Sequence, residues 1–122
     1  MDINILVVDD SEIMRKVIER TFNICGYDST SIFQASNGKE GLEIIEKNGV
    51  DLLLVDINMP IMDGVQMLEE VQKNPTAEEL AVVIVSAESN QERIDELSRF
   101  GAKFIHKPFT PEKLMSELDQ LI

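Results

Sequence analysis

The chain has 122 residues, of which 43% are hydrophobic and 28% are charged, and its formal net charge is −12. A chain of this size and hydrophobic content folds as one domain, residues 1–122, with a core of its own, and is not intrinsically disordered. The negative charge argues against binding to nucleic acids and to anionic membranes, because both need a basic surface.

Cysteine usage and the lack of targeting patterns indicate the compartment. Cys25 is the only cysteine, so no disulfide can form within the chain. The sequence has neither a signal-peptide pattern nor an apolar run long enough to span a membrane. We therefore expect a cytoplasmic protein in which the Cys25 thiol is buried or half-buried.

The first half of the chain alternates strand and helix patterns. Residues 3–8 are almost all apolar and predict a strand that is covered on both faces, as in a parallel sheet. Ser11 or Asp10 can then cap a helix. The apolar residues of this helix recur at helical spacing: Ile13, Met14, Val17, Ile18 and Phe22. Residues 30–34 predict a second strand, of mixed polarity.

The alternation continues to the end of the chain. A helix marked by Leu42 and Ile45 precedes a third, wholly apolar strand at residues 52–55. The next helix is marked by Val65, Leu68 and Val71. Residues 80–85 predict an apolar fourth strand and residues 102–106 a fifth strand of mixed polarity. The last helix opens at Thr110, with proline at its first position, and its apolar residues are Leu114, Met115, Leu118, Leu121 and Ile122.

Five strand–helix repeats predict an α/β fold, a doubly wound (βα)5 parallel sheet with helices on both faces. The helix between the fourth and fifth strands follows from this alternation alone. The three apolar strands belong in the middle of the sheet, and the two strands of mixed polarity belong at its edges, where less burial is expected.

Polar residues follow the predicted strands where ligands bind in such sheets, beyond their carboxyl ends. Asp9 and Asp10 follow the first strand, Asp56 the third, Ser86 the fourth and Lys107 the fifth. Clustered carboxylates repel each other by about 1–4 kcal/mol per pair at 4 Å. A hard cation such as Mg²⁺ would offset this repulsion, and a lysine and a hydroxyl suit the oxygens of a phosphoryl group.

Each of these residues has an ordinary explanation when it is considered alone. Asp9 or Asp10 could only cap a helix, and Asp56 could be a loop acid. Ser86 could be a capping hydroxyl, and Lys107 an ordinary surface lysine. These explanations do not account for polar residues at the ends of four strands at once, which favours a shared site.

Four stretches, LVVDDSEIMRKVI, LLVDINMPIMDG, VIVSAE and GAKFIHKPF, resemble the receiver domain of two-component response regulators in order and spacing. The resemblance covers essentially the whole chain. It implies a flavodoxin-like (CheY-like) three-layer sandwich with strand order 2-1-3-4-5. It also implies a phosphorylation-activated switch rather than an enzyme, since such a domain catalyses only its own phosphorylation and dephosphorylation.

The resemblance implies a phosphorylation site with a metal ion. Asp56 matches the phosphoacceptor, and Lys107 matches the lysine that contacts the phosphoryl group. Asp9 and Asp10 match the acidic pair that binds Mg²⁺, with Mn²⁺ as a substitute, and Asp10 would be the more direct ligand. Asp56 and the backbone carbonyl of Asn58 would complete the protein ligands.

The remaining positions implied by the resemblance concern the switch. Ser86 matches the hydroxyl residue that contacts the phosphoryl group, and Phe104 takes the place of the aromatic switch residue. Glu88, like Asn58, stands where family members tune dephosphorylation. The bond between Lys107 and Pro108 would be cis, which an X-Pro bond adopts at only ~0.5–1 kcal/mol over trans.

The resemblance also implies partners. A sensor histidine kinase or a phosphotransfer protein would donate the phosphoryl group from a phosphohistidine. The surface of the fourth helix, fifth strand and fifth helix would then change and control a downstream target that the sequence does not identify. We expect a monomer or a phosphorylation-dependent homodimer, and a stand-alone regulator, for example of the chemotaxis type, rather than a receiver cut from a longer protein.

Two other functions share parts of this pattern. A Mg²⁺-dependent phosphatase with an aspartyl-phosphate intermediate usually has a second acid two residues after the nucleophile, where this chain has Asn58. The amide of Asn58 cannot transfer a proton. A flavin-binding protein of the flavodoxin type would need a loop rich in glycine and hydroxyl groups after the first strand, and Asp9 and Asp10 would instead repel its phosphate.

Overall fold

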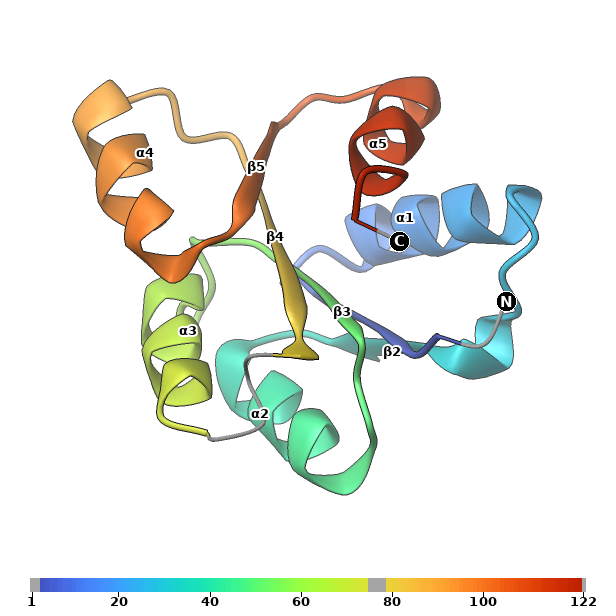
Figure 1. Cartoon of the computed structure of the whole chain (residues 1–122), viewed down its shortest axis with the longest axis horizontal. Helices are drawn as coiled ribbons and strands as arrows, with labels where there is room; N and C mark the ends of the chain where they lie inside the picture. The colour runs from blue at the N-terminus through green and yellow to red at the C-terminus, as the bar shows by residue number, and fades with distance from the viewer. Residues whose placement is uncertain (1–2, 75–78, 122) are drawn as a thin grey trace.

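The computed structural model describes residues 3–74 and 79–121, and in them five parallel strands form one sheet in the order β2-β1-β3-β4-β5 (Figure 1). This confirms the predicted strand order. The strands are β1 Ile5–Val8, β2 Ile32–Ala35, β3 Leu52–Val55, β4 Ala81–Ser86 and β5 Lys103–His106. The helices are α1 Glu12–Ile24, α2 Gly38–Lys47, α3 Gly64–Gln72, α4 Gln91–Leu97 and α5 Pro111–Leu118.

The helices cover both faces of the sheet, so the strands separate two hydrophobic cores. Figure 1 shows α1 and α5 on one side of the sheet and α2, α3 and α4 on the other. Ile5 and Val7 of β1 pack into the core under α1 and α5, whereas Leu6 and Val8 pack into the core under the other helices. Because side chains alternate between two buried faces, the central strands are continuous apolar runs.

Several element boundaries differ from the prediction. Strand β1 begins at Ile5 instead of residue 3, β4 spans Ala81–Ser86 instead of residues 80–85, and β5 begins at Lys103 instead of residue 102. The second strand begins at Ile32 instead of residue 30, because Asp28 caps a short 3₁₀ turn in which its carboxylate accepts hydrogen bonds from the Thr30 N–H (2.9 Å) and hydroxyl (3.0 Å). The last helix ends at Leu118, and Leu121, predicted to extend it, is 40% exposed in a turn. Ile122 lies outside the described residues.

Two local features were not evident from the sequence. Helix α4 is short and buries only Leu97, so its sequence shows no repeating apolar pattern. Asn90 caps this helix by accepting a hydrogen bond from the Arg93 N–H (3.1 Å). The expectation for Cys25 was wrong, since this residue is exposed. It lies at the end of α1, where the chain turns away through Gly26 (φ 97°) and the apolar stripe of the helix has ended.

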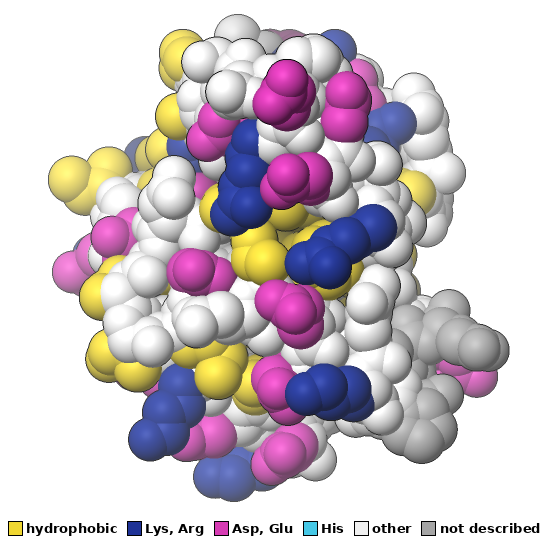
Figure 2. Space-filling model, turned by 90° about the vertical axis from the view of Figure 1, so that its left-hand side faces the viewer, with side chains coloured by type: hydrophobic (Ala, Val, Ile, Leu, Met, Phe, Trp, Pro, Cys, Tyr) yellow, Lys and Arg dark blue, Asp and Glu magenta, His cyan; other side chains and the backbone are white. Residues whose placement is uncertain are grey.

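Figure 2 shows the side of the molecule that carries α2, α3 and α4, where acidic, basic and hydrophobic side chains are interspersed. Three exposed ion pairs belong to α3, α4 and the residues that follow them: Lys73–Glu70 at 3.0 Å, Arg93–Glu96 at 3.4 Å and Arg99–Glu69 at 3.9 Å. Exposed pairs of this kind stabilise a fold little, so the fold depends on its two cores. None of the described helices is long and apolar enough to span a membrane.

The loop between β3 and α3 is held close to the sheet and contains an unusual backbone conformation. The Gly64 N–H donates to the Ile57 carbonyl (2.9 Å), and a side chain at Gly64 would collide with the Asp56 carbonyl. Ile61 has φ 68° and is the only non-glycine residue with positive φ among those described. Its side chain is 78% exposed. A β-branched residue is strained in this left-handed region, and burial does not compensate here.

Replacing Ile61 with asparagine should therefore stabilise the protein. Asparagine tolerates the left-handed conformation, so we expect Ile61→Asn to raise the free energy of unfolding by about 1 kcal/mol. Urea unfolding followed by circular dichroism measures the change.

Ile24→Asn is the matched control, because Ile24 is also 78% exposed but ends a right-handed helix. It makes the surface equally more polar without relieving strain and should give no gain. Equal effects of the two substitutions would show that Ile61 is not strained.

Candidate functional site

The polar residues that follow the strands lie together because hydrogen bonding between strands continues one residue past their ends. The Asp9 N–H donates to the Ala35 carbonyl (3.1 Å), the Asp56 N–H to Val8 (2.9 Å) and the Lys107 N–H to Ser86 (2.9 Å). The backbones of Asp9, Asp56 and Lys107 are thereby fixed to the neighbouring strands. The parallel order then brings these ends, distant in sequence, to one edge of the sheet.

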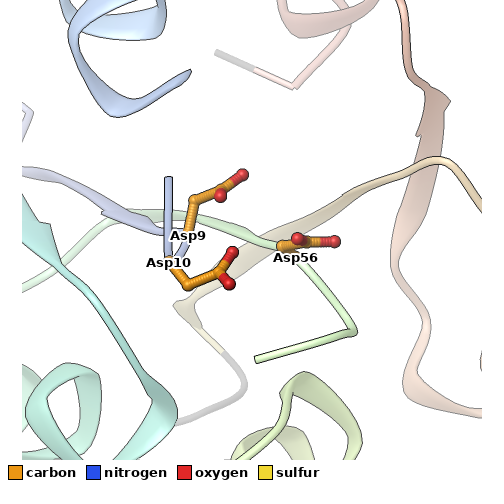
Figure 3. A group of neighbouring side chains, drawn as sticks. All are labelled: Asp9, Asp10 and Asp56. Carbon is orange, nitrogen blue, oxygen red and sulfur yellow. The ribbon is translucent and has the colours of Figure 1, made fainter. Parts of the chain in front are cut away.

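Three carboxylates form the centre of this edge. Asp9, Asp10 and Asp56 offer oxygen atoms that lie within 4.8 Å of one another. Figure 3 shows the side chains gathered where β1 and β3 end. Asp9 is 2% and Asp56 8% exposed, whereas Asp10 is open to solvent. Two of the three negative charges are therefore held where water screens them poorly.

Lys107 offsets part of this charge. Its ammonium lies 2.7 Å from Asp9 Oδ2 and 3.3 Å from Asp56 Oδ2. The other oxygen of each carboxylate accepts from the backbone, Asp9 from the Ser11 N–H (2.9 Å) and Asp56 from the Ile57 N–H (2.8 Å). Both buried carboxylates thus have an ammonium and an amide as partners, as buried charges require.

The electrostatic balance is visible in two pKa shifts. Burial raises the pKa of Asp56, and the Asp9 charge adds to this, while Lys107 and the Ile57 N–H act against it. Burial by itself lowers the pKa of Lys107, but the hydrogen bond to Asp9 and the charges of Asp56 and Asp9 outweigh it, so that the pKa is raised. Lys107 therefore stays positively charged at neutral pH.

The donor set fits a hard divalent cation. Its side-chain ligand atoms are all carboxylate oxygens, which Mg²⁺ and Mn²⁺ prefer. Among the described residues, none donates a hydrogen bond to the Asp10 carboxylate, so its oxygens are available for a ligand. Asn58 lies exposed in the loop after β3, two residues beyond Asp56. Its carbonyl remains a predicted ligand.

The predicted switch residues lie on β4, on β5 and in the loop after β4. Ser86 is fully buried at the end of β4, and its Oγ accepts a hydrogen bond from the Glu88 N–H (3.1 Å). The Glu88 carboxylate accepts from the Asn90 N–H (3.1 Å) at the start of α4. Phe104 is half-buried on β5, with its ring centroid 4.7 Å from that of the exposed His106. The Lys107–Pro108 peptide bond is cis.

One contributor to the site was missed in the sequence. Arg15 of α1 donates from Nη1 to the Asp9 carbonyl (2.6 Å). Its partner Gln34 accepts a hydrogen bond from Arg15 Nε at 3.2 Å. Gln34 is the one polar residue of β2, and this is the only hint that the sequence offers. Neither residue follows the end of a strand, which is the pattern that identified the others.

Residues 5–119 match a family model described as the response regulator receiver domain. A chemotaxis protein CheY homolog of Campylobacter jejuni is 32% identical, with 97% of this chain and 91% of that protein covered. The chemotaxis protein CheY-3 of Vibrio cholerae is 31% identical, with 98% and 92% covered. The crystal structure of the chemotaxis response regulator CheY4 of Vibrio cholerae has a TM-score of 0.90 at 28% identity and covers all of both chains.

The raised pKa of Asp56 predicts how stability depends on pH. A raised pKa means that the folded state binds the proton more readily, so this group stabilises the fold below its unfolded pKa near 3.8 and ceases to do so as pH rises through the folded value. At pH 7 and without Mg²⁺, Asp56→Asn should raise the free energy of unfolding by about 1–2 kcal/mol, since one of three clustered carboxylates becomes neutral. Urea unfolding at a series of pH values should show this gain vanish below about pH 4.

Glu43→Gln is the control, because it removes one negative charge at an exposed position of α2. Its effect should be small at every pH. If Asp56→Asn gave no more stabilisation at pH 7 than Glu43→Gln, the carboxylate cluster would not be a source of instability.

Proposed function

The chain belongs to the response regulator receiver domain family, and we propose that Asp56 is its phosphoacceptor. It is a receiver domain of the CheY type, and the phosphatase alternative has no support among its relatives. The observation that carries the proposal is the position of Asp56 between Lys107 and the other two carboxylates, at the end of a central strand. The phosphoryl donor would be the phosphohistidine of a sensor histidine kinase or of a phosphotransfer protein.

Phosphoryl transfer requires positioning and charge neutralisation more than proton transfer. A carboxylate oxygen of Asp56 attacks phosphorus as the bond to the histidine nitrogen breaks, and that nitrogen takes up a proton. Asp9 and Asp56 keep Lys107 positively charged. Its ammonium pairs with their carboxylates before transfer and would pair with the phosphoryl oxygens after transfer. Asp9, Asp10, Asp56 and the Asn58 carbonyl would hold Mg²⁺, or Mn²⁺ in its place. When bound, the metal supplies the positive charge that a dianionic phosphoryl group needs.

The switch follows from a change of partner at Ser86. Its hydroxyl would leave the Glu88 N–H and donate to a phosphoryl oxygen, and Phe104 would rotate into the space that is vacated. Both side chains adjoin the surface formed by α4, β5 and α5, which would change in shape. Phosphorylation thus favours one of two states through contacts that exist only in that state. Glu88 and Asn58 would tune how fast the phosphoryl group is lost.

The domain organisation, the partners and the location of the protein also follow from a receiver function. We propose that residues 1–122 form one receiver domain that catalyses only its own phosphorylation and dephosphorylation. The relatives named as chemotaxis proteins support a chemotaxis-type role with a protein target. The charge of −12 supports neither nucleic acid nor membrane as a partner. The protein would act in the cytoplasm, as a monomer or as a homodimer when phosphorylated.

Intact mass after incubation with acetyl phosphate tests the phosphoacceptor. We expect the wild type to gain one phosphoryl group when Mg²⁺ is present and none when the metal is chelated. Asp56→Asn should gain none, while the control Asp95→Asn, at an exposed position of α4, should gain one. Phosphorylation that persists in Asp56→Asn would place the acceptor elsewhere.

Ser86→Ala should separate phosphorylation from the switch. The variant keeps Asp56 and should still bind beryllofluoride, a phosphoryl analogue, because the hydroxyl is needed only after transfer. The amide chemical shifts of α4 and β5 should then change much less than in the wild type.

Ser89→Ala, in the exposed loop before α4, is the control and should respond like the wild type. A full shift response in Ser86→Ala would remove Ser86 from the switch.

A further inference from the structure

A chain of three hydrogen bonds joins α1, β2 and the end of β1 next to the acidic cluster. Arg15 Nη1 donates to the Asp9 carbonyl at 2.6 Å, and Arg15 Nε donates to Gln34 Oε1 at 3.2 Å. Gln34 Nε2 in turn donates to Glu19 Oε2 at 2.8 Å. All three side chains are half-buried. We refer to Arg15, Gln34 and Glu19 as the Arg15 network.

The Arg15 network has a defined geometry. Arg15 and Glu19 are one turn apart on α1, where an arginine and a glutamate often pair directly. Here the Gln34 amide lies between them, with its oxygen towards the donor Arg15 and its nitrogen towards the acceptor Glu19. The planar guanidinium can then present a second N–H to Asp9 in a fixed direction.

The network completes the hydrogen bonding of Asp9. Its N–H is bound to the Ala35 carbonyl and its carboxylate to Lys107 and the Ser11 N–H. The remaining polar group is its carbonyl, which Arg15 binds. The Asp9 carbonyl belongs to the peptide plane that joins Asp9 to Asp10, so Arg15 holds that plane at its carbonyl.

Asp10 depends on this restraint. Among the described residues, no group donates to its carboxylate, and its side chain is exposed. The position of the Asp10 backbone therefore decides which points its carboxylate can reach. We propose that the Arg15 network is a positioning network that aims Asp10 at the divalent cation and so sets the affinity of the site for Mg²⁺. The inference rests on the proposed metal site but not on phosphoryl transfer.

The charge of Arg15 and its role in positioning predict opposite effects of its removal on Mg²⁺ affinity. The guanidinium is a positive charge near the metal site, so its removal alone would strengthen cation binding. Loss of positioning would weaken it, and removing the partners of metal ligands typically costs about tenfold or more in metal affinity. Gln34 separates the two effects, because Gln34→Met breaks both of its hydrogen bonds and changes no charge.

The test is a titration of each metal-free protein with Mg²⁺, followed by amide chemical shifts, beside urea unfolding without metal. We expect Gln34→Met and Arg15→Met to raise the dissociation constant about tenfold. Arg15→Lys should also weaken binding, because lysine keeps the charge but lacks the fork that binds both Asp9 and Gln34.

Two controls match these changes. Arg20→Met removes an exposed arginine from the same helix, and Gln120→Met removes an exposed glutamine that bonds to Lys103 (2.8 Å). Neither should weaken Mg²⁺ binding. A merely structural network would lower the free energy of unfolding in Gln34→Met and leave its dissociation constant unchanged.

The outcomes separate this inference from the proposed function. An unchanged dissociation constant in Gln34→Met, or tighter binding in Arg15→Met, would overturn the positioning role. Failure of the wild type to bind Mg²⁺ would overturn the metal site itself. If one variant failed to fold, the other two would decide, because Gln34 and Arg15 lie on different elements.

Discussion

The ion pairs between Lys107 and two aspartates are the constraint on which the rest of the site depends. Lys107 lies 98 residues from Asp9 in sequence, yet their charged atoms are 2.7 Å apart. The parallel order of the strands, with β1 next to β3, brings these strand ends to one edge of the sheet. One ammonium cannot neutralise three carboxylates, and Asp10 has no partner among the described residues, so the charge of the site favours a further cation.

The side chains of Asp9 and Asp56 have more hydrogen-bond partners than the two predicted switch residues have. The central strands are buried on both faces, and hydrogen bonds past their ends fix the backbones of Asp9 and Asp56. Ser86 and Phe104 differ, because the only hydrogen bond of the Ser86 side chain among the described residues is the one from the Glu88 N–H, and Phe104 lies on an edge strand. The charged residues of the site can change the positions of Ser86 and Phe104 only if a new contact forms. A phosphoryl group bound at the site would offer such a contact to Ser86.

The sequence predicted those features for which a local pattern is enough to place a residue in the fold. The apolar runs identified β1, β3 and β4 as central, and residues following strand ends led to Asp56 and Lys107. Prediction failed where a partner distant in sequence decides the structure. Helix α4 buries too little to show a pattern, and Arg15 resembles any helix arginine until Gln34 of another element is placed beside it.

The electrostatics of the site also explain why phosphoryl acceptance would need a metal ion. Three carboxylates and one ammonium leave a net negative site, and burial already raises the pKa of Asp56. A phosphoryl group would add further negative charge, which the unassisted site would resist. A divalent cation held by the three aspartates would reverse this balance, because it would stabilise the carboxylates before transfer and the phosphoryl oxygens after it. Because metal binding would favour the folded state as well, metal affinity, folding stability and phosphorylation would be linked through the same charges.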